Sequence, residues 1–249
     1  MGRIVFKNIY KSFGPKHILR GVDLEVNPGE VFFIIGQSGA GKSVLVKHLV
    51  GLLMPDKGQI FLDDLEITSL SEKEFYPVRK RCAMVFQNST LFDSMTLQEN
   101  VALPIRKHRD VSQKQAMEMA LEKLRLVGMH HYATRVPADF GDGMQKKVAI
   151  ARALTLDPEY VIFDEPTTGI DPISAAMVDK LIRHLSDNLG VTSIVISHDL
   201  RSIFGIADRI AMLYKGQFIL DGTRDAFLNS DNPIVQQFIN GRPDGPMEV

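Results

Sequence analysis

The stretch VFFIIGQSGAGKSVLVKHLV, residues 31–50, decides the fold. Its first five residues, VFFII, form an apolar run of the length expected for a buried strand of a parallel sheet. GQSGAGKS (36–43) matches the phosphate-binding pattern G-x-x-x-x-G-K-[ST]. Apolar side chains then recur with helical spacing from 42 to 53, and Pro55 favours a helix end there. Strand, glycine-rich loop and helix in this order predict a nucleotide site at the carboxyl end of the strand.

The residue types of the glycine-rich loop suit phosphate. Glycines let main-chain N–H groups turn toward phosphate oxygens, at the positive end of the following helix. Lys42 would reach the β- and γ-phosphates, and the Ser43 hydroxyl would bind Mg²⁺. An ordinary strand-to-helix turn would not need this lysine and this serine. We therefore predict an ATP-binding loop made of Gly36, Gln37, Ser38, Gly39, Ala40, Gly41, Lys42, Ser43 and Val44.

Polar residues follow three more apolar runs. In VIFDEP, Asp164 would hold the metal and Glu165 would polarise an attacking water. Gln87 ends CAMVFQ and would contact both metal and water, while His198 follows TSIVIS and would contact the γ-phosphate. A single Gln or His at a strand end is more often an ordinary surface residue. Ligands of open α/β sheets, however, bind beyond the carboxyl ends of the strands, which favours one shared site. The sequence thus predicts Glu165, His198 and Gln87 as catalytic, and Ser43, Gln87 and Asp164 as metal ligands.

Composition indicates an ordinary globular chain. Of the 249 residues 45% are hydrophobic, and 29 basic residues stand against 30 acidic ones. The net charge of −1 provides no positive field, so we expect no nucleic-acid partner. A single cysteine, Cys82, excludes an internal disulfide and a thiolate metal cluster within one chain. No apolar run approaches the ~20 residues that cross a bilayer, so any membrane role would be peripheral.

The remaining patterns predict one α/β domain over residues 1–249. Short strands at 3–9 and 18–26 are joined by the turn-forming SFGPK. The buried-strand runs YVIFD (160–164) and TSIVIS (192–197) flank a helical stretch from Pro172 to Leu189, as in a parallel sheet. Residues from about 96 to 156 are helical in pattern and form an insertion, with one apolar face containing Ala116, Ala120, Leu124 and Val127.

GQSGAGKS, VFQ, VIFDEP, TTGID and ISHD, in this order and at these spacings, resemble the ATP-binding cassette (ABC) ATPase family over nearly the whole chain. The resemblance implies ATP hydrolysis with Mg²⁺, and a mostly parallel P-loop core with an N-terminal antiparallel β subdomain and a helical subdomain at about 96–156. It also implies that Phe13 stacks on adenine, although Tyr10 is nearby. Gln87 would be the Q-loop residue, Asp171 the D-loop residue and His198 the switch histidine.

In this family the signature LSGGQ reaches across to the ATP held by a second subunit. The matching stretch here is FGDGM, in which Gly141, Asp142, Gly143 and Met144 would act in trans. One phosphate loop and one signature per chain imply a head-to-tail homodimer with two ATPs between the subunits.

The signature departs from the family pattern at two positions. Gly141 has no hydroxyl to donate, and a hydrogen bond to a charged group is worth about 1.5–3 kcal/mol. Asp142 adds a carboxylate near the γ-phosphate, with a repulsion of about 1–3 kcal/mol at a screened dielectric. The same Asp142 is predicted to N-cap the helix in a capping box with Gln145, worth roughly 1 kcal/mol. We expect slow hydrolysis, and about tenfold faster turnover when Gly141→Ser and Asp142→Gly are combined.

Two longer stretches, RKRCAMVFQNSTLFDSMTLQENVALPIRKH and QQFINGRPDGPMEV, resemble the ATPase subunits of Mla-type bacterial phospholipid transporters, which serve Mce-domain proteins. The resemblance implies a motor at the cytoplasmic side of the inner membrane, bound peripherally to an integral-membrane permease, with an Mce-domain protein and a small cytoplasmic regulatory subunit as further partners. The permease helix would contact the segment after the Q-loop, which contains the apolar residues Leu91, Phe92, Met95 and Leu97. We expect half of these four to be ordinary core.

Two alternatives remain open at this point. The transporter's cargo could be an amino acid or a lipoprotein, or the chain could be a soluble ABC ATPase of DNA repair, translation or cofactor assembly. The absence of a long heptad insertion, of a tandem cassette and of a basic field argues against the soluble class.

The C-terminal tail, from about 230 to 249, has a pattern of its own. Pro233 favours the start of a short helix, and RPDGP follows it. We interpret the tail as a segment that leaves the domain and packs on a neighbour.

Overall fold

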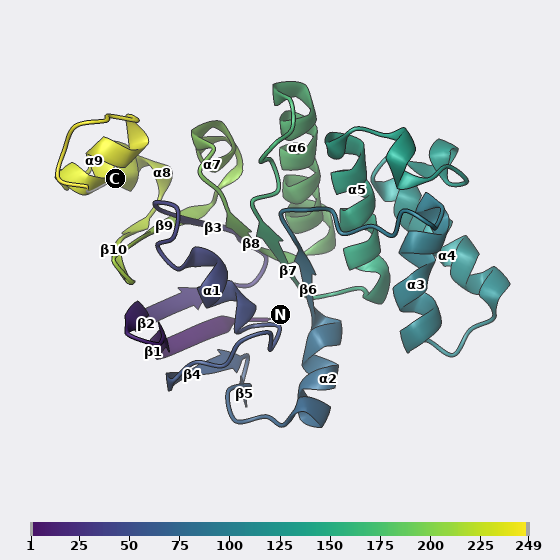
Figure 1. The fold of residues 1–249 in the computed structure, drawn as a ribbon, viewed down its shortest axis with the longest axis horizontal. Coiled ribbons are helices and arrows are strands. Elements are labelled where there is room, and N and C mark those ends of the chain that lie inside the picture. Colours follow the sequence, from purple (N-terminus) through teal and green to yellow (C-terminus); the bar gives the residue numbers. More distant parts are fainter. Residues whose placement is uncertain (1, 248–249) are drawn as a thin grey trace.

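The computed structural model describes residues 2–247, which form two sheets and a set of helices around them (Figure 1). The larger sheet has six strands in the order β10-β9-β3-β8-β7-β6. All neighbours in it are parallel except β10, which runs antiparallel to β9. Its strands are β3 (Val31–Ile35), β6 (Cys82–Val85), β7 (Tyr160–Asp164), β8 (Thr192–Ile196), β9 (Arg209–Tyr214) and β10 (Gln217–Gly222).

The centre of this sheet is apolar on both faces. Every residue of β3, β7 and β8 is buried, as expected for parallel strands covered on both sides. Along β3 the side chains alternate between two cores: Val31, Phe33 and Ile35 face the helices, while Phe32 and Ile34 face the smaller sheet. The carboxyl ends of β3, β7 and β8 therefore lie at one edge of the sheet.

The smaller sheet is antiparallel, with the order β2-β1-β4-β5, which confirms the predicted N-terminal β unit. Its strands are β1 (Ile4–Phe13), β2 (Lys16–Val26), β4 (Lys57–Leu62) and β5 (Leu65–Glu66). Ile4, Phe6 and Leu19 of this sheet are buried against the larger sheet and the helix after the glycine-rich loop.

The helices are α1 (Lys42–Lys47), α2 (Glu72–Arg81), α3 (Leu97–His108), α4 (Gln113–Leu126), α5 (Asp142–Ala153), α6 (Pro172–Leu189), α7 (Leu200–Ile206), α8 (Arg224–Leu228) and α9 (Pro233–Ile239). Figure 1 shows α3, α4 and α5 together beyond the β6 edge. The predicted apolar face is confirmed, since Ala116, Ala120, Leu124 and Val127 are all buried. Helix α1 is shorter than the predicted 42–53, because the chain tightens at His48 and Leu49 and then turns at Gly51, whose φ is 66°.

The tail begins its helix at Pro233, as predicted, but it does not leave the domain within the described residues. Val235 and Met247 are buried in the same core as the helices. The Gln237 side chain accepts a hydrogen bond from the Met247 N–H and donates one to the Met247 carbonyl. The interpretation of a tail that leaves the domain is therefore wrong for residues 230–247, while its packing on a neighbour stays a prediction. Within residues 2–247, no helix is both long enough and apolar enough to span a bilayer.

Candidate nucleotide site

The glycine-rich loop opens into a cavity of about 540 Å³ at the carboxyl edge of the larger sheet. The structure brings together there three predicted residues from different strand ends, Gln87, Glu165 and His198. The full lining is Ile18, Gly36, Gln37, Ser38, Gly39, Gly41, Lys42, Ser43, Val44, Gln87, Glu165, His198 and Phe238. Ile18 and Phe238 were missed by sequence reasoning, because they come from β2 and from the folded-back tail.

Glycine is needed at two points of the loop. A Cβ on Gly36 would lie 2.2 Å from the Leu213 carbonyl oxygen of β9, so the loop can leave β3 only without a side chain. Gly41 has a φ of 107°, which L side chains rarely adopt, and it is the N-cap of α1. No side chain caps α1, so the first N–H groups of the helix are left to a ligand.

Lys42 lies at the first position of α1 and points back across the loop. Its ammonium donates to the Gly36 carbonyl at 2.7 Å and to the Gln37 carbonyl at 3.0 Å. Burial lowers the pKa of Lys42, and the carboxylates of Glu165 and Asp164 oppose this effect. A cation of this kind, surrounded by carbonyl oxygens and facing an open cavity, is suited to phosphate.

A hydroxyl and a carboxylate meet beside the loop. Ser43 Oγ donates to Asp164 Oδ1 at 2.9 Å, and Gln87 lines the same cavity. Burial is the main cause that raises the pKa of Asp164, so a cation at this position would favour its charged form. Hydroxyl, amide and carboxylate oxygens are the ligands that Mg²⁺ prefers, and it takes only one or two carboxylates alongside substrate phosphates. Ser43, Gln87 and Asp164 therefore fit Mg²⁺, which when bound would neutralise charge on the phosphates.

Glu165 is held in an unusual conformation next to His198. Its φ of 54° lies in the left-handed region, which is strained for a glutamate. One carboxylate oxygen, Oε2, lies 2.8 Å from His198 Nδ1 and accepts from Thr168 Oγ1 at 2.9 Å. His198 is exposed while Glu165 is mostly covered. Thr168, which sequence reasoning missed, thus helps to orient the carboxylate toward the cavity.

Helix α5 starts one residue earlier than predicted, and the predicted capping box is wrong. Gly141 is the N-cap, with φ −69° and ψ 164°, and no side chain caps the helix. Asp142 already has helical geometry as the first residue of α5. There its negative charge interacts favourably with the helix dipole. Gln145 turns away from position 142 and donates to the carbonyls of Pro137 and Phe140 at 3.1 and 2.9 Å.

The signature residues lie against the D-loop rather than against the glycine-rich loop. A second cavity, of about 350 Å³, is lined by Gly141, Asp142, Gly143, Met144, Gly169, Ile170, Asp171 and Ser174. Asp171 caps α6 by accepting from the N–H groups of Ile173 and Ser174. Within the described residues, none of Gly141 to Met144 lines the first cavity. The glycine-rich loop and the signature therefore line two separate cavities of the chain.

The predicted adenine contact remains an expectation. Phe13 and Tyr10 are 48% and 38% exposed, so neither belongs to the core. The Lys11 ammonium lies 5.6 Å from the centre of the Phe13 ring. Neither ring is among the residues that line the cavity described above.

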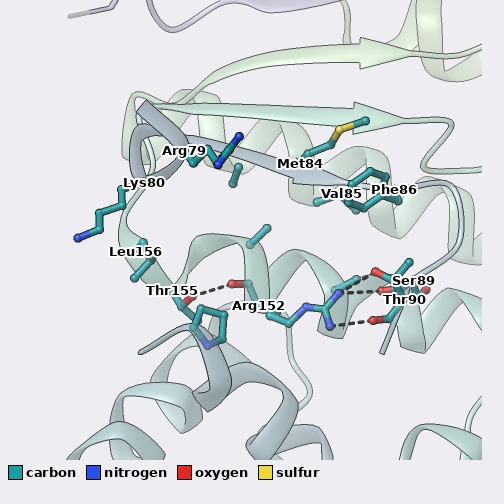
Figure 2. A pocket seen from close by; sticks show the side chains of 14 residues that line it. Arg79, Lys80, Met84, Val85, Phe86, Ser89, Thr90, Arg152, Thr155 and Leu156 are labelled. Carbon is teal, nitrogen blue, oxygen red and sulfur yellow. Dashed lines mark hydrogen bonds between the residues drawn. The ribbon is translucent and has the colours of Figure 1, made fainter. Parts of the chain in front are cut away.

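A smaller cavity, of about 180 Å³, lies between α2, β6, α3 and α5 (Figure 2). Its wall combines apolar side chains with the cations of Arg79, Lys80 and Arg152. Figure 2 shows the Arg152 guanidinium directed at the segment after Gln87. It donates to the Ser89 carbonyl, the Thr90 carbonyl and the Thr90 hydroxyl at 3.1, 2.9 and 2.9 Å. Helix α5 thereby fixes the shape of this segment.

Comparison with known proteins gives a consistent family. A family model described as "ABC transporter" matches residues 19–168. The intermembrane phospholipid transport system ATP-binding protein MlaF of Haemophilus influenzae is 39% identical over 244 residues, covering 98% of this chain and 92% of its own. The probable ribonucleotide transport ATP-binding protein mkl of Mycobacterium leprae is 37% identical over 244 residues, covering 98% and 70%.

A solved structure has the same fold. The dimeric post-hydrolysis state of the ATP-binding cassette MJ0796, bound to ADP and Pi, matches with a TM-score of 0.80 and 30% identity, over 88% of this chain and 98% of that one. These matches agree with the α/β fold described above. The chain therefore belongs to the ATP-binding subunits of ABC transporters, ATPases that use ATP and Mg²⁺.

Proposed function

We propose that this chain is the motor subunit of a bacterial inner-membrane transporter that moves phospholipids between membranes. The observation that carries the proposal is the 39% identity to MlaF over nearly the full length of both chains. The mkl relative has a name that refers to ribonucleotides, so the family alone leaves the cargo open. The proposed partners are a second copy of the chain, an integral-membrane permease, an Mce-domain protein and a small cytoplasmic regulatory subunit.

In the proposed cycle the two surfaces of the chain belong to two different sites of a head-to-tail homodimer. Lys42 and the glycine-rich loop bind the phosphates of one ATP. Ser43, Gln87 and Asp164 hold Mg²⁺, and Glu165 polarises the attacking water, with His198 contacting the γ-phosphate. Gly141 to Met144 contact the ATP of the other subunit. Separate cavities for the loop and for the signature support this arrangement, because a single chain does not close a site around one nucleotide.

The segment after Gln87 is the proposed contact with the permease. Of its four apolar residues, Leu97 is fully buried and Leu91 packs partly against the core. Phe92 is 49% exposed, so it is available to a partner at the cytoplasmic face of the membrane. Its main-chain N–H and C=O form hydrogen bonds with the buried Asn100 side chain. These bonds fix the main chain that carries the aromatic ring.

The proposal is tested by isolating the full-length chain from native membranes and identifying the proteins and lipids that come with it. We expect a permease, an Mce-domain protein and bound phospholipid. Phe92→Asp should reduce recovery of the permease, whereas Leu228→Asp, at an exposed leucine of α8, should not. Recovery of an amino-acid-binding or nucleotide-binding protein in place of the Mce-domain protein would contradict the phospholipid proposal. Recovery without any membrane protein would contradict the transporter proposal itself.

A further inference from the structure

One buried cation of α5 has no part in the roles described above. Lys146 lies one turn after Asp142 and is 3% exposed. Its ammonium donates to the main-chain oxygen of Gln87 and lies 3.5 Å from the main-chain oxygen of Glu165. Within residues 2–247 the Lys146 nitrogen forms no ion pair with a carboxylate. Its partners are thus the backbones of two residues that line the nucleotide cavity.

Keeping an ammonium here is costly. Burial lowers the pKa of Lys146, and the charges that oppose this effect are those of Asp142, Glu165 and Asp164, in that order. A desolvated charge without a close counter-ion destabilises a fold, and an apolar residue of similar size is often neutral or stabilising. Global stability therefore does not explain a lysine at this position.

The two main-chain oxygens belong to residues whose placement matters for hydrolysis. Gln87 and Glu165 follow β6 and β7, which are neighbouring parallel strands. Glu165 has a left-handed φ of 54°, and a strained residue of this kind, at a cost of about 1–3 kcal/mol, persists only when its surroundings fix it. Lys146 touches the carbonyl of this residue and, at the same time, the carbonyl of Gln87.

Lys146 also connects these residues to the signature. It belongs to α5, whose first residues face the D-loop cavity. Arg152 of the same helix holds Ser89 and Thr90. Helix α5 therefore contacts the segment after β6 twice, through Lys146 in its second turn and through Arg152 in its last turn, so a shift of the signature would move Gln87 together with it.

We propose that Lys146 is a positioning residue for ATP hydrolysis, which ties the signature helix to Gln87 and Glu165 through their main-chain oxygens and offsets the charge of Asp142. The inference rests on the proposed roles of Glu165 and the signature. When α5 moves against the ATP of the second subunit, Lys146 then shifts the main chain of Glu165. This shift needs no new contact between Lys146 and the nucleotide. The proposed role of Lys146 also explains how an aspartate is accommodated at position 142, where the family pattern has glycine.

The test compares Lys146→Met, Lys146→Arg and a matched control, Lys147→Met, in the full-length chain. Lys147 is the next residue of α5, and its ammonium contacts Met177 Sδ at 3.4 Å, away from the nucleotide cavity. For each variant we would measure kcat and KM for MgATP, binding of a fluorescent ATP analogue, and thermal unfolding. Glu165→Gln is measured in parallel as the reference for lost catalysis.

For Lys146→Met we expect kcat to fall about tenfold or more, with KM and nucleotide binding within about twofold of wild type and no loss of thermal stability. Lys146→Arg should restore kcat to within about threefold, and Lys147→Met should behave as wild type. A wild-type kcat in Lys146→Met beside an inactive Glu165→Gln would overturn this inference alone. So would a fall in kcat that follows a fall in stability and is not restored by arginine. A wild-type rate in Glu165→Gln would overturn both the inference and the proposed catalytic role on which it rests.

Discussion

The two helix starts that we propose as phosphate contacts are built alike and charged oppositely. Both α1 and α5 have a glycine N-cap and no capping side chain, so both leave main-chain N–H groups to a ligand. At the first helical position, however, α1 has Lys42 and α5 has Asp142. The glycine-rich loop adds a cation to the helix dipole, whereas the signature adds an anion.

This difference indicates which end controls each step. ATP affinity depends on the end with the cation, because there the lysine, the dipole and the loop all favour phosphate. At α5 Lys146 only offsets the charge of Asp142, so the dipole acts there without an added cation, and we expect closure of the dimer to be the weaker interaction. Mutations at α1 should therefore change binding, and mutations at α5 should change turnover and assembly.

The largest expected effect is at Glu165, which belongs to neither helix start. Glu165→Gln should reduce turnover by about 10²–10⁴-fold, because removing a general base costs that much. ATP affinity should be retained, since both phosphate-facing ends are unchanged. ATP hydrolysis, nucleotide binding and sedimentation with ATP would be measured together, and sedimentation should show a trapped dimer. Equal turnover in the variant and in wild type would remove Glu165 from the catalytic role.

Removing the cation from α1 is the next largest change. Lys42→Ala should weaken ATP binding by about ten- to a hundredfold, since a hydrogen bond to a charged group contributes about 1.5–3 kcal/mol. The loss should appear in the dissociation constant of ATP measured by calorimetry. Lys114, an exposed residue of α4, provides the control, because Lys114→Ala removes a positive charge at a residue that does not line the nucleotide cavity. An unchanged dissociation constant in Lys42→Ala would contradict the claim that ATP affinity depends on the cation at the start of α1.

The two glycines at the start of α5 should respond differently when a side chain is added. A Cβ on Gly143 would lie 2.6 Å from Cβ and Oγ of Ser174 in α6, whereas a Cβ on Gly141 would meet nothing within 4 Å. Gly143→Ala should therefore destabilise the chain by about 1–3 kcal/mol, as overpacking does, while Gly141→Ala should lose far less. Denaturant unfolding measures both. Ser174→Gly should therefore cost less stability in Gly143→Ala than in the wild-type chain, and an equal cost in both would show that the contact with α6 is not the cause.

Most of the α1 end could be predicted from the sequence, and much of the α5 end could not. The strand at 31–35 and the helix from Pro172 to Leu189 were predicted with the observed bounds, since fully apolar runs and a first-turn proline are local features. The capping box at Asp142 was wrong because Gly141 is the N-cap and Gln145 donates instead to the carbonyls of Pro137 and Phe140, contacts that the capping-box pattern does not contain. Lys146 could not be recognised, because its two oxygen partners come from distant strand ends. Phe238 reaches the cavity only because the tail folds back.

The smallest expected effect is at Gly141, and it decides how far the signature limits turnover. Position 141 has the extended backbone of an N-cap, with φ −69° and ψ 164°, and a side chain there meets nothing within 4 Å. Serine is a preferred N-cap residue, so Gly141→Ser should stabilise α5 by a few tenths of a kcal/mol or more, and its hydroxyl can still donate to a phosphate. We expect up to about tenfold faster turnover of the isolated chain at saturating ATP, because one such hydrogen bond is worth about 1.4 kcal/mol or more. Asp142→Gly should add little, since Lys146 already offsets the carboxylate and would lose the largest of the negative charges that act on it. A rise in thermal stability without faster turnover would mean that the serine only caps the helix. A double variant about tenfold faster than Gly141→Ser alone would mean that Asp142 repels the phosphate in spite of Lys146.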